Sequence, residues 1–322
     1  MSEKSQPKKS PIKSDNPFDK SSKSASDQPA KFDEPIIRAA LENLAKGNAA
    51  YAKFNARIVQ TRQTVLGVRT PALRTFAKKL ARQISGYDDA AELLRIIDDK
   101  IFEEVLLVGF ALNYAKNLTT GERIALTKIY LEKVDSWAQI DTFIGKYPAA
   151  ALDEYWNFAL ECLGSSREMA VRCGLIILFE NFLTSEKIDE VLAKVRAVKS
   201  DKYYVRMAAA WLYAEAAVNF YELILTELLR PEIDVWTKTK ALSKMLESRR
   251  FSPAQKAEIR ATRDELKSGA AKNSGIAAKK FGANLKKSAV KNHTDGTKIS
   301  GNGVKNSADC GENNSAKTAE RD

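Results

Sequence analysis

Apolar residues recur every three or four positions along residues 33–267, a spacing typical of amphipathic α-helices. No segment shows the strict alternation expected of a half-buried strand, and good helix formers dominate. The pattern therefore predicts an all-α protein. The expected helices cover residues 34–46, 49–59, 71–84, 88–97, 102–115, 121–134, 135 or 136 to 147, 149–163, 167–183, 186–198, 203–220, a short segment to 229, 235–247 and 253–267.

Local turn chemistry supports several of these boundaries. Gly67 permits a turn, Thr70 is expected to be an N-cap, and Pro71 suits the first helical position because its missing N–H costs nothing there. Asp135 and Ser136 are both candidate caps for the helix that follows residue 134. We interpret the Thr70-Pro71 pair as structural.

A faint internal repeat indicates how the helices are arranged. Val171-Arg172 begins an apolar helix ending in Asn181-Phe182, and Val205-Arg206 begins a similar one ending in Asn219-Phe220. Each is followed by a shorter partner, as in helical-repeat solenoids of the HEAT class. Such a superhelix has a concave face lined by one helix of each pair.

The two ends differ in composition from the middle. Residues 1–32 and 268–322 are polar and lysine-rich, so we expect both tails to be disordered around a folded domain at 33–267. The tails carry most of the formal net charge of +11. Basic arms suit a polyanionic partner such as nucleic acid, although Lys-rich tails can also act only as solubilising segments.

Composition also excludes several classes of function. No apolar run is long enough to cross a bilayer, and no signal-peptide pattern is present, so we expect a reduced cytosolic setting. Cys162, Cys173 and Cys310 show no metal-type spacing, and the first two are expected to be core residues. The only histidine, His293, lies in the C-terminal tail, which excludes a histidine triad, metal site or general base in the folded part.

Five segments together resemble the AlkD-type DNA alkylation repair family, over about residues 40–267. They are Leu66 to Arg74 (LGVRTPALR), Ser136 to Asp141 (SWAQID), Glu168 to Arg172 (EMAVR), Tyr203 to Trp211 (YYVRMAAAW) and Lys240 to Lys244 (KALSK). The resemblance implies a HEAT-like superhelix that cradles duplex DNA and excises cationic N3- and N7-alkylated purines.

The resemblance implies a DNA glycosylase with a catalytic pocket of Trp137, Asp141 and Trp211, beside which Arg172 contacts the DNA backbone. It implies action without a deep base pocket, no metal or cofactor, alkylated duplex DNA as the partner, and no membrane; we expect a monomer associated with the nucleoid. Further candidates for phosphate contacts are Arg69, Arg74, Lys78, Lys202, Arg206, Lys240, Lys244, Arg249 and Arg250.

The expected chemistry fits these residues. An alkylated purine already carries a positive charge, so it leaves without a proton from the enzyme. Positive charge then develops on the deoxyribose, where the Asp141 carboxylate can stabilise it and orient water. The indoles of Trp137 and Trp211 can wall the nucleotide through cation–π contacts worth roughly 0.5–2 kcal/mol each.

Simpler interpretations stand beside these. Trp211 lies in an apolar helix and can be a core residue, and Trp137 can be either buried or exposed. Asp141 can be a solvated residue near a helix start, and Arg172 can pair with Glu168 one turn away. At the level of the whole chain, the alternatives are a non-catalytic module that binds damaged or branched DNA and a protein-binding scaffold.

Overall fold

The computed structural model describes residues 31–268. Within that range the structure is helical apart from turns, and the only β-type pairing is an isolated bridge between Thr64 and Ile101. The all-α prediction is confirmed. The predicted tails, with His293 and Cys310, lie outside the described residues, except for Lys31, Phe32 and Ser268. Ser268 is the last residue of α14, Phe32 is buried, and Lys31 Nζ lies 2.5 Å from Asp89 Oδ2.

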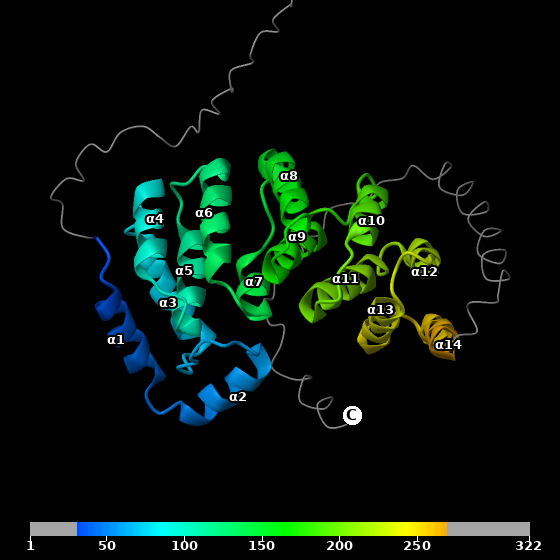
Figure 1. The fold of residues 1–322 in the computed structure, drawn as a ribbon, viewed down its shortest axis with the longest axis horizontal. Coiled ribbons are helices and arrows are strands. Elements are labelled where there is room, and N and C mark those ends of the chain that lie inside the picture. Colours follow the sequence, from blue (N-terminus) through cyan, green and yellow to red (C-terminus); the bar gives the residue numbers. More distant parts are fainter. Residues whose placement is uncertain (1–30, 269–322) are drawn as a thin grey trace, which may run out of the picture. The chain divides into compact units, whose positions relative to one another are not determined.

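The described chain divides into two compact units after Phe158, within helix α8. In the first unit α3 packs on α5, α5 on α7, and α4 on α6, so alternate helices form neighbouring rows (Figure 1). Its elements are α1 (Glu34–Ala45), α2 (Ala49–Val59), α3 (Thr70–Ala81), α4 (Tyr87–Ile96), α5 (Phe102–Tyr114), α6 (Thr120–Lys133), α7 (Trp137–Phe143), the 3-10 turn η1 (Ala149–Ala151) and the start of α8 (Leu152–Leu163).

The second unit repeats this scheme, because α9 packs on α11 and α11 on α13 (Figure 1). Contacts between every second helix are expected when helix pairs stack, so each unit has the packing of a helical-repeat solenoid. Its elements are α9 (Glu168–Asn181), α10 (Ile188–Ala197), α11 (Tyr203–Ala216), α12 (Tyr221–Leu228), α13 (Val235–Glu247) and α14 (Pro253–Ser268).

Most predicted helices are found within a residue or two, and α2 and α13 match the prediction at both ends. Four predictions were wrong by three residues or more. Helix α8 begins at Leu152, after the 3-10 turn η1, rather than at Ala149. Helix α3 ends at Ala81, three residues before the predicted end at Ile84. Helix α7 ends at Phe143 rather than near Tyr147, and α11 ends at Ala216 rather than Phe220.

The loop before α3 is organised by a buried carboxylate rather than by the predicted cap. The N-cap of α3 is Arg69, and Thr70 is already helical, so the cap prediction was off by one residue. Glu103 is 1 % exposed and accepts backbone N–H bonds from Leu66 at 2.9 Å, Gly67 at 2.8 Å and Val68 at 3.3 Å. These bonds satisfy amides that would otherwise be unpaired, and they fix the approach to α3.

The predicted turn at Gly67 is confirmed and is sterically demanding. Its φ is +93°, and a Cβ atom placed there would lie 2.9 Å from the Cβ of Ala52 on α2. Only glycine combines this left-handed backbone with such a close approach. Gly67 therefore lets the loop before α3 pack directly on α2.

Candidate functional site

Helix α7 carries two of the predicted catalytic residues. Ser136 is its N-cap: the side chain accepts from Ala138 N, while the Gln139 side chain bonds back to the Ser136 N–H as a capping box. Trp137 and Asp141, four residues apart on this helix, are both half-buried. The prediction that this segment is helical, with the indole one turn before the carboxylate, is confirmed.

The indole of Trp137 is held by a helix that is distant in sequence. Its Nε1–H donates to the carbonyl of Ile58 at 3.1 Å, and the Ser136 hydroxyl donates to the carbonyl of Val59 at 2.6 Å. Both carbonyls belong to the last turn of α2, where no further helical N–H is available to them. The C-terminal end of α2 therefore fixes the orientation of Trp137.

A polar network extends this junction around the start of α7. Asp135 accepts from the Thr61 hydroxyl at 2.5 Å and from the Arg62 backbone N–H at 2.8 Å. The amide of Gln139, a fully buried residue, donates to Gln63 Oε1 at 2.7 Å. Buried polar groups with satisfied partners hold a rigid arrangement, so α7 is fastened to the segment that follows α2.

The second unit carries the other predicted pocket residues on α9 and α11. Arg172 is 3 % exposed, and its Nη1 donates to the Tyr204 carbonyl at 2.9 Å. Glu168 accepts the Tyr204 N–H at 2.8 Å. Arg172 and Glu168 thus both bind the backbone of Tyr204, in the first turn of α11. The phosphate contact expected for Arg172 stays a prediction.

Trp211 contacts an aromatic ring and lies near a lysine. It is half-buried, its ring centroid is 4.6 Å from that of Phe179 on α9, and Lys244 Nζ lies 5.9 Å from the Trp211 ring centroid. A cation at this distance from an indole face is attracted by the ring quadrupole. Lys244 and Trp211, both predicted site residues, are therefore neighbours in the structure.

Two predicted cations, Arg206 and Lys240, lie against Trp236 in the second unit. Trp236 was not among the residues predicted from the sequence. The guanidinium of Arg206 lies 4.4 Å from the Trp236 ring centroid, and Lys240 Nζ lies 5.6 Å from it. Trp236 is the second residue of α13, four positions before Lys240, and this i, i+4 spacing of an aromatic residue and a lysine was the signal in the sequence.

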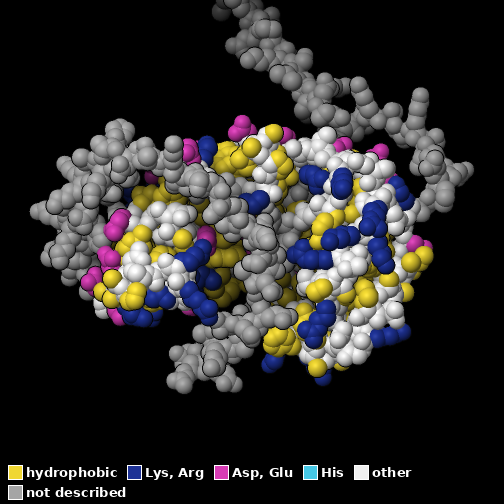
Figure 2. Space-filling view, turned by 180° about the vertical axis from the view of Figure 1, so that it is seen from behind, with side chains coloured by type: hydrophobic (Ala, Val, Ile, Leu, Met, Phe, Trp, Pro, Cys, Tyr) yellow, Lys and Arg dark blue, Asp and Glu magenta, His cyan; other side chains and the backbone are white. Residues whose placement is uncertain are grey.

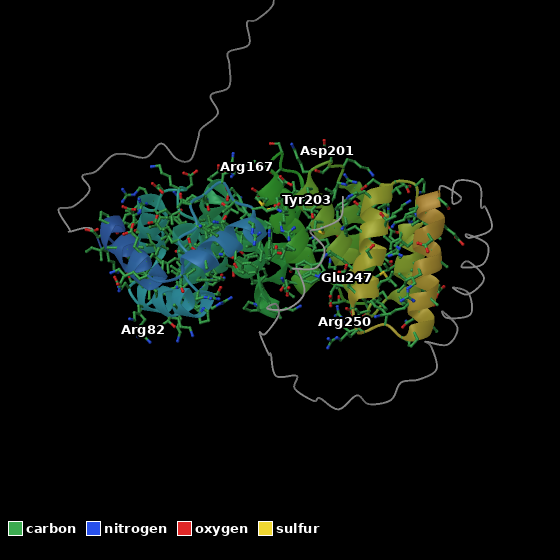
Figure 3. All side chains as sticks on the ribbon, turned by 90° about the horizontal axis from the view of Figure 1, so that it is seen from below. Arg82, Arg167, Asp201, Tyr203, Glu247 and Arg250 are labelled. Carbon is green, nitrogen blue, oxygen red and sulfur yellow. The ribbon has the colours of Figure 1, made fainter. Side chains whose placement is uncertain are left out.

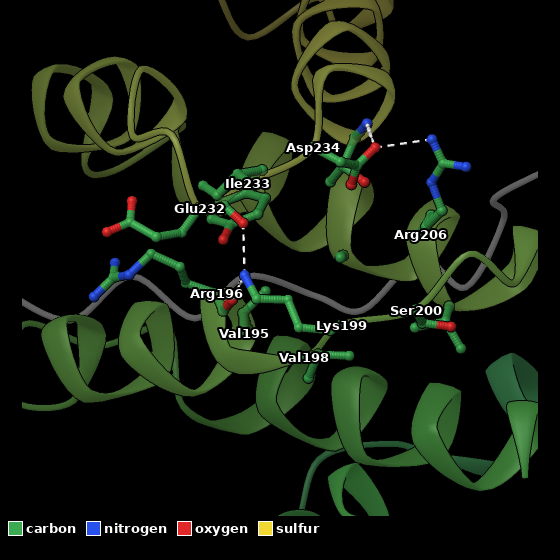
Figure 4. Close-up of a pocket in the computed structure, with 13 residues that line it drawn as sticks. Val195, Arg196, Val198, Lys199, Ser200, Arg206, Glu232, Ile233 and Asp234 are labelled. Atoms are coloured by element: carbon green, nitrogen blue, oxygen red, sulfur yellow. Dashed lines mark hydrogen bonds and ion pairs between the residues drawn. The ribbon is translucent and has the colours of Figure 1, made fainter. Parts of the chain in front are cut away.

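Arg206, in the first turn of α11, also bonds to the residue that caps α13, beside a contact between two loops (Figure 4). Its Nη2 lies 2.8 Å from Oδ1 of Asp234, the N-cap of α13, while Lys199 Nζ donates to the Glu232 carbonyl at 2.6 Å. These residues line a small cavity of about 140 Å³, which the buried Tyr213 also lines. The carboxylate of Asp234 has its pKa lowered by bonds from Thr237 and by Arg206, against the effect of burial.

The first unit has its own basic surface on α3. Arg69 stacks over the ring of Tyr51 at 3.8 Å and Arg74 over Phe110 at 4.2 Å, while Lys78 Nζ lies 5.3 Å from the Tyr114 ring centroid. All three cations are exposed, and α3 contains no acidic residue. Figure 2 shows lysine and arginine side chains gathered over the unit that contains α3.

The remaining candidates lie at opposite edges of the second unit. Lys202, the exposed N-cap of α11, adjoins Tyr203 at one edge, and Arg250 lies at the other (Figure 3). Arg250 Nη2 bonds Glu215 Oε2 at 2.6 Å, so it is partly neutralised. Arg249 is exposed.

The two described cysteines are structural. Cys162 and Cys173 are buried, and the Cys173 thiol has its pKa raised by a hydrogen bond with Cys162 and by burial. Within residues 31–268 no cluster of three potential metal ligands is found. Over the same range no helix is both long and apolar enough to span a bilayer.

The fold and these surfaces define a helical-repeat protein in which cations lie against aromatic rings in both units, exposed on α3 and half-buried on α11 and α13. The chain belongs to the DNA alkylation repair enzyme family, which matches residues 37–221. This match includes Trp137, Asp141, Arg172 and Trp211, and it ends before Trp236, Lys240 and Lys244. None of the curated proteins and none of the solved structures compared with the chain matches it. Family membership gives the protein a role in DNA alkylation repair.

Proposed function

We propose that this protein is a DNA glycosylase that removes cationic N3- and N7-alkylated purines from duplex DNA. The observation that supports this most strongly is on α7. There, in a member of a DNA alkylation repair family, an indole fixed by the Ile58 carbonyl stands one turn before the carboxylate of Asp141. The expected partner is duplex DNA that contains an alkylated base.

The proposed reaction is a hydrolysis. The bond between C1′ of the deoxyribose and the purine nitrogen breaks, and its electron pair neutralises the charge on the alkylated ring. Water adds to C1′ and loses a proton to solvent. The lesion is a good leaving group already, so the remaining barrier lies in the developing positive charge on the sugar, which a carboxylate can stabilise.

Each candidate residue has a distinct role in this proposal. Asp141 stabilises the oxocarbenium-like sugar and orients the water, while Trp137 and Trp211 wall the nucleotide. Because Trp137 and Asp141 belong to the first unit and Trp211 to the second, the proposal requires α7 and α11 to face the same nucleotide. The remaining predicted DNA contacts are Arg69, Arg74, Arg172, Lys202, Arg206, Lys240 and Lys244.

Release of free base from a defined duplex tests the proposal. The wild-type protein should release 7-methylguanine from a duplex that contains one such lesion, as measured by chromatography of the free base. Asp141→Asn should lower the single-turnover rate by about 100-fold or more, because a neutral amide cannot stabilise the sugar cation as a carboxylate does. Its affinity for the duplex should stay within about twofold, since Asp141 makes no favourable contact with phosphates.

The second candidate function is a non-catalytic module that binds alkylated or distorted DNA. The cation–aromatic pairs of α3 and α13 favour it equally, because they suit DNA binding without chemistry. Tight duplex binding without base release at enzyme excess would support this candidate and contradict the glycosylase. A protein-binding scaffold would instead show no affinity for DNA.

A further inference from the structure

An exposed aromatic residue lies beside the cations of α11 and α13. Tyr203, the first residue of α11, is 52 % exposed, which is high for so large a ring. Its ring centroid lies 5.2 Å from that of Tyr204 and 5.7 Å from that of Trp236, and the interplanar angles are 80° and 68°. Both contacts are edge-on rather than stacked.

The surroundings of Tyr203 carry positive charge. Lys202 precedes it, and Arg206 and Lys240 both lie against Trp236, the ring that contacts Tyr203. The carboxylate of Asp234 also lies here, and Arg206 pairs with it at 2.8 Å. A ring accessible to solvent and bordered by cations is the arrangement that proteins use to bind unpaired bases, which combine a flat π-face with a phosphate on each side.

We infer that Tyr203 and Trp236, with Lys202, Arg206 and Lys240, form a stacking platform for an unpaired nucleobase of a DNA strand. The base stacks on Tyr203, whose position Trp236 supports from the side, and the cations hold the flanking phosphates. The Arg206 guanidinium lies over Trp236, 4.4 Å from its ring centroid, so this face of Trp236 is covered. Tyr203 is therefore the ring better placed to receive a base.

This platform deepens the proposed function, and it rests on that function only in taking DNA as the partner. Any step that disturbs a base pair leaves a base without its stacking neighbours, at a cost of a few kcal/mol. A protein ring that replaces the lost stacking lowers this cost. The platform would then select DNA in which pairing is already weakened at one nucleotide.

The test uses undamaged DNA, so its outcome is independent of base release. Two duplexes of the same sequence are compared, one fully paired and one with 2-aminopurine as a single-nucleotide bulge. Wild-type protein should bind the bulged duplex more tightly and quench the 2-aminopurine fluorescence, as stacking does. Tyr203→Ala should weaken binding to the bulged duplex by about tenfold and abolish the quenching, while its affinity for the paired duplex stays within about twofold.

Two further variants separate stacking from charge and from folding. Tyr203→Phe keeps the ring and should retain both the preference and the quenching. Tyr203→Lys adds a charge and removes the ring, so it should bind paired DNA at least as tightly as wild type and lose the preference for the bulge. Equal affinity of the wild-type protein for the two duplexes would overturn the inference. Equal losses on both duplexes in Tyr203→Ala would do so as well.

Discussion

Individual residues in this protein act through partners that are distant in sequence. Trp137 was identified through the family resemblance, but its bond to Ile58, 79 residues earlier, requires the folded chain. The same holds for Arg172. Its i, i+4 spacing with Glu168 suggested a pair on the helix surface, whereas both residues bind the backbone of Tyr204. Sequence spacing identifies neighbours on one helix, and contacts between helices need the tertiary structure.

Glu103 gives a prediction about pH at the scale of one residue. Burial raises the pKa of its carboxyl above the ordinary value of 4.5, while the N–H bonds from Leu66, Gly67 and Val68 lower it in part. A carboxyl with a higher pKa in the folded state than in the unfolded state binds more protons when folded. Its contribution to stability is therefore largest below the unfolded pKa and declines as pH rises through the folded pKa.

Glu103→Gln should remove this decline, because the amide does not titrate. We expect the free energy of unfolding of the variant to fall less than that of wild type between about pH 4.5 and neutral pH. Urea denaturation across this range measures both slopes. Parallel curves for the two proteins would contradict the assignment of this pH dependence to Glu103.

At the scale of elements, the hydrophobic pattern predicted the helices well and the ends of some helices poorly. Helix α13 was predicted at both ends because Asp234 caps it and its apolar positions are periodic. Helix α7 was predicted too long: its end was expected at Tyr147, before Pro148, whereas the chain leaves the helix after Phe143. The start of α3 was missed by one residue because a buried carboxylate on α5 orders that loop.

Two glycines with positive φ in the described part of the chain provide a matched pair of variants. Gly47 has φ +79° and open space where a side chain would lie, whereas Gly67 has φ +93° and a close approach to Ala52. Gly47→Ala should therefore cost only the left-handed backbone penalty, about 1 kcal/mol. Gly67→Ala should cost roughly 2–4 kcal/mol, because the new methyl group also clashes with α2.

Thermal and urea unfolding of the two variants measures the difference. Similar losses of stability in both would mean that the loop before α3 relaxes away from α2 without cost. Gly47 serves as the control for Gly67, since both have a positive φ and they differ in their surroundings.

At the scale of the whole molecule, the repeat pattern predicted an all-α solenoid, and the packing within each unit confirms it. The sequence did not indicate the division after Phe158, because α8 is continuous in its hydrophobic pattern through that point. The four predicted pocket residues are split between the two units. Their convergence on one nucleotide stays a prediction.

Affinity for duplex DNA should depend steeply on salt, because the proposed contacts of cations in both units with phosphates would release counterions. Lys202→Gln should reduce the slope of log affinity against log salt by about 1. Arg82→Gln, which removes an exposed cation outside the predicted set, should leave the slope unchanged. Fluorescence anisotropy at several salt concentrations measures these slopes, and equal effects of the two variants would indicate diffuse attraction by net charge.

The anchoring of Trp137 to the end of α2 has a consequence for how the protein can be shortened. A fragment beginning after residue 60 would keep every proposed catalytic side chain, yet it would lack the two carbonyls that set the tryptophan rotamer and seat Ser136. The end of α2 thus holds the Trp137 side chain in place, and removing α2 should lower the rate of the proposed reaction even where the shortened chain still folds.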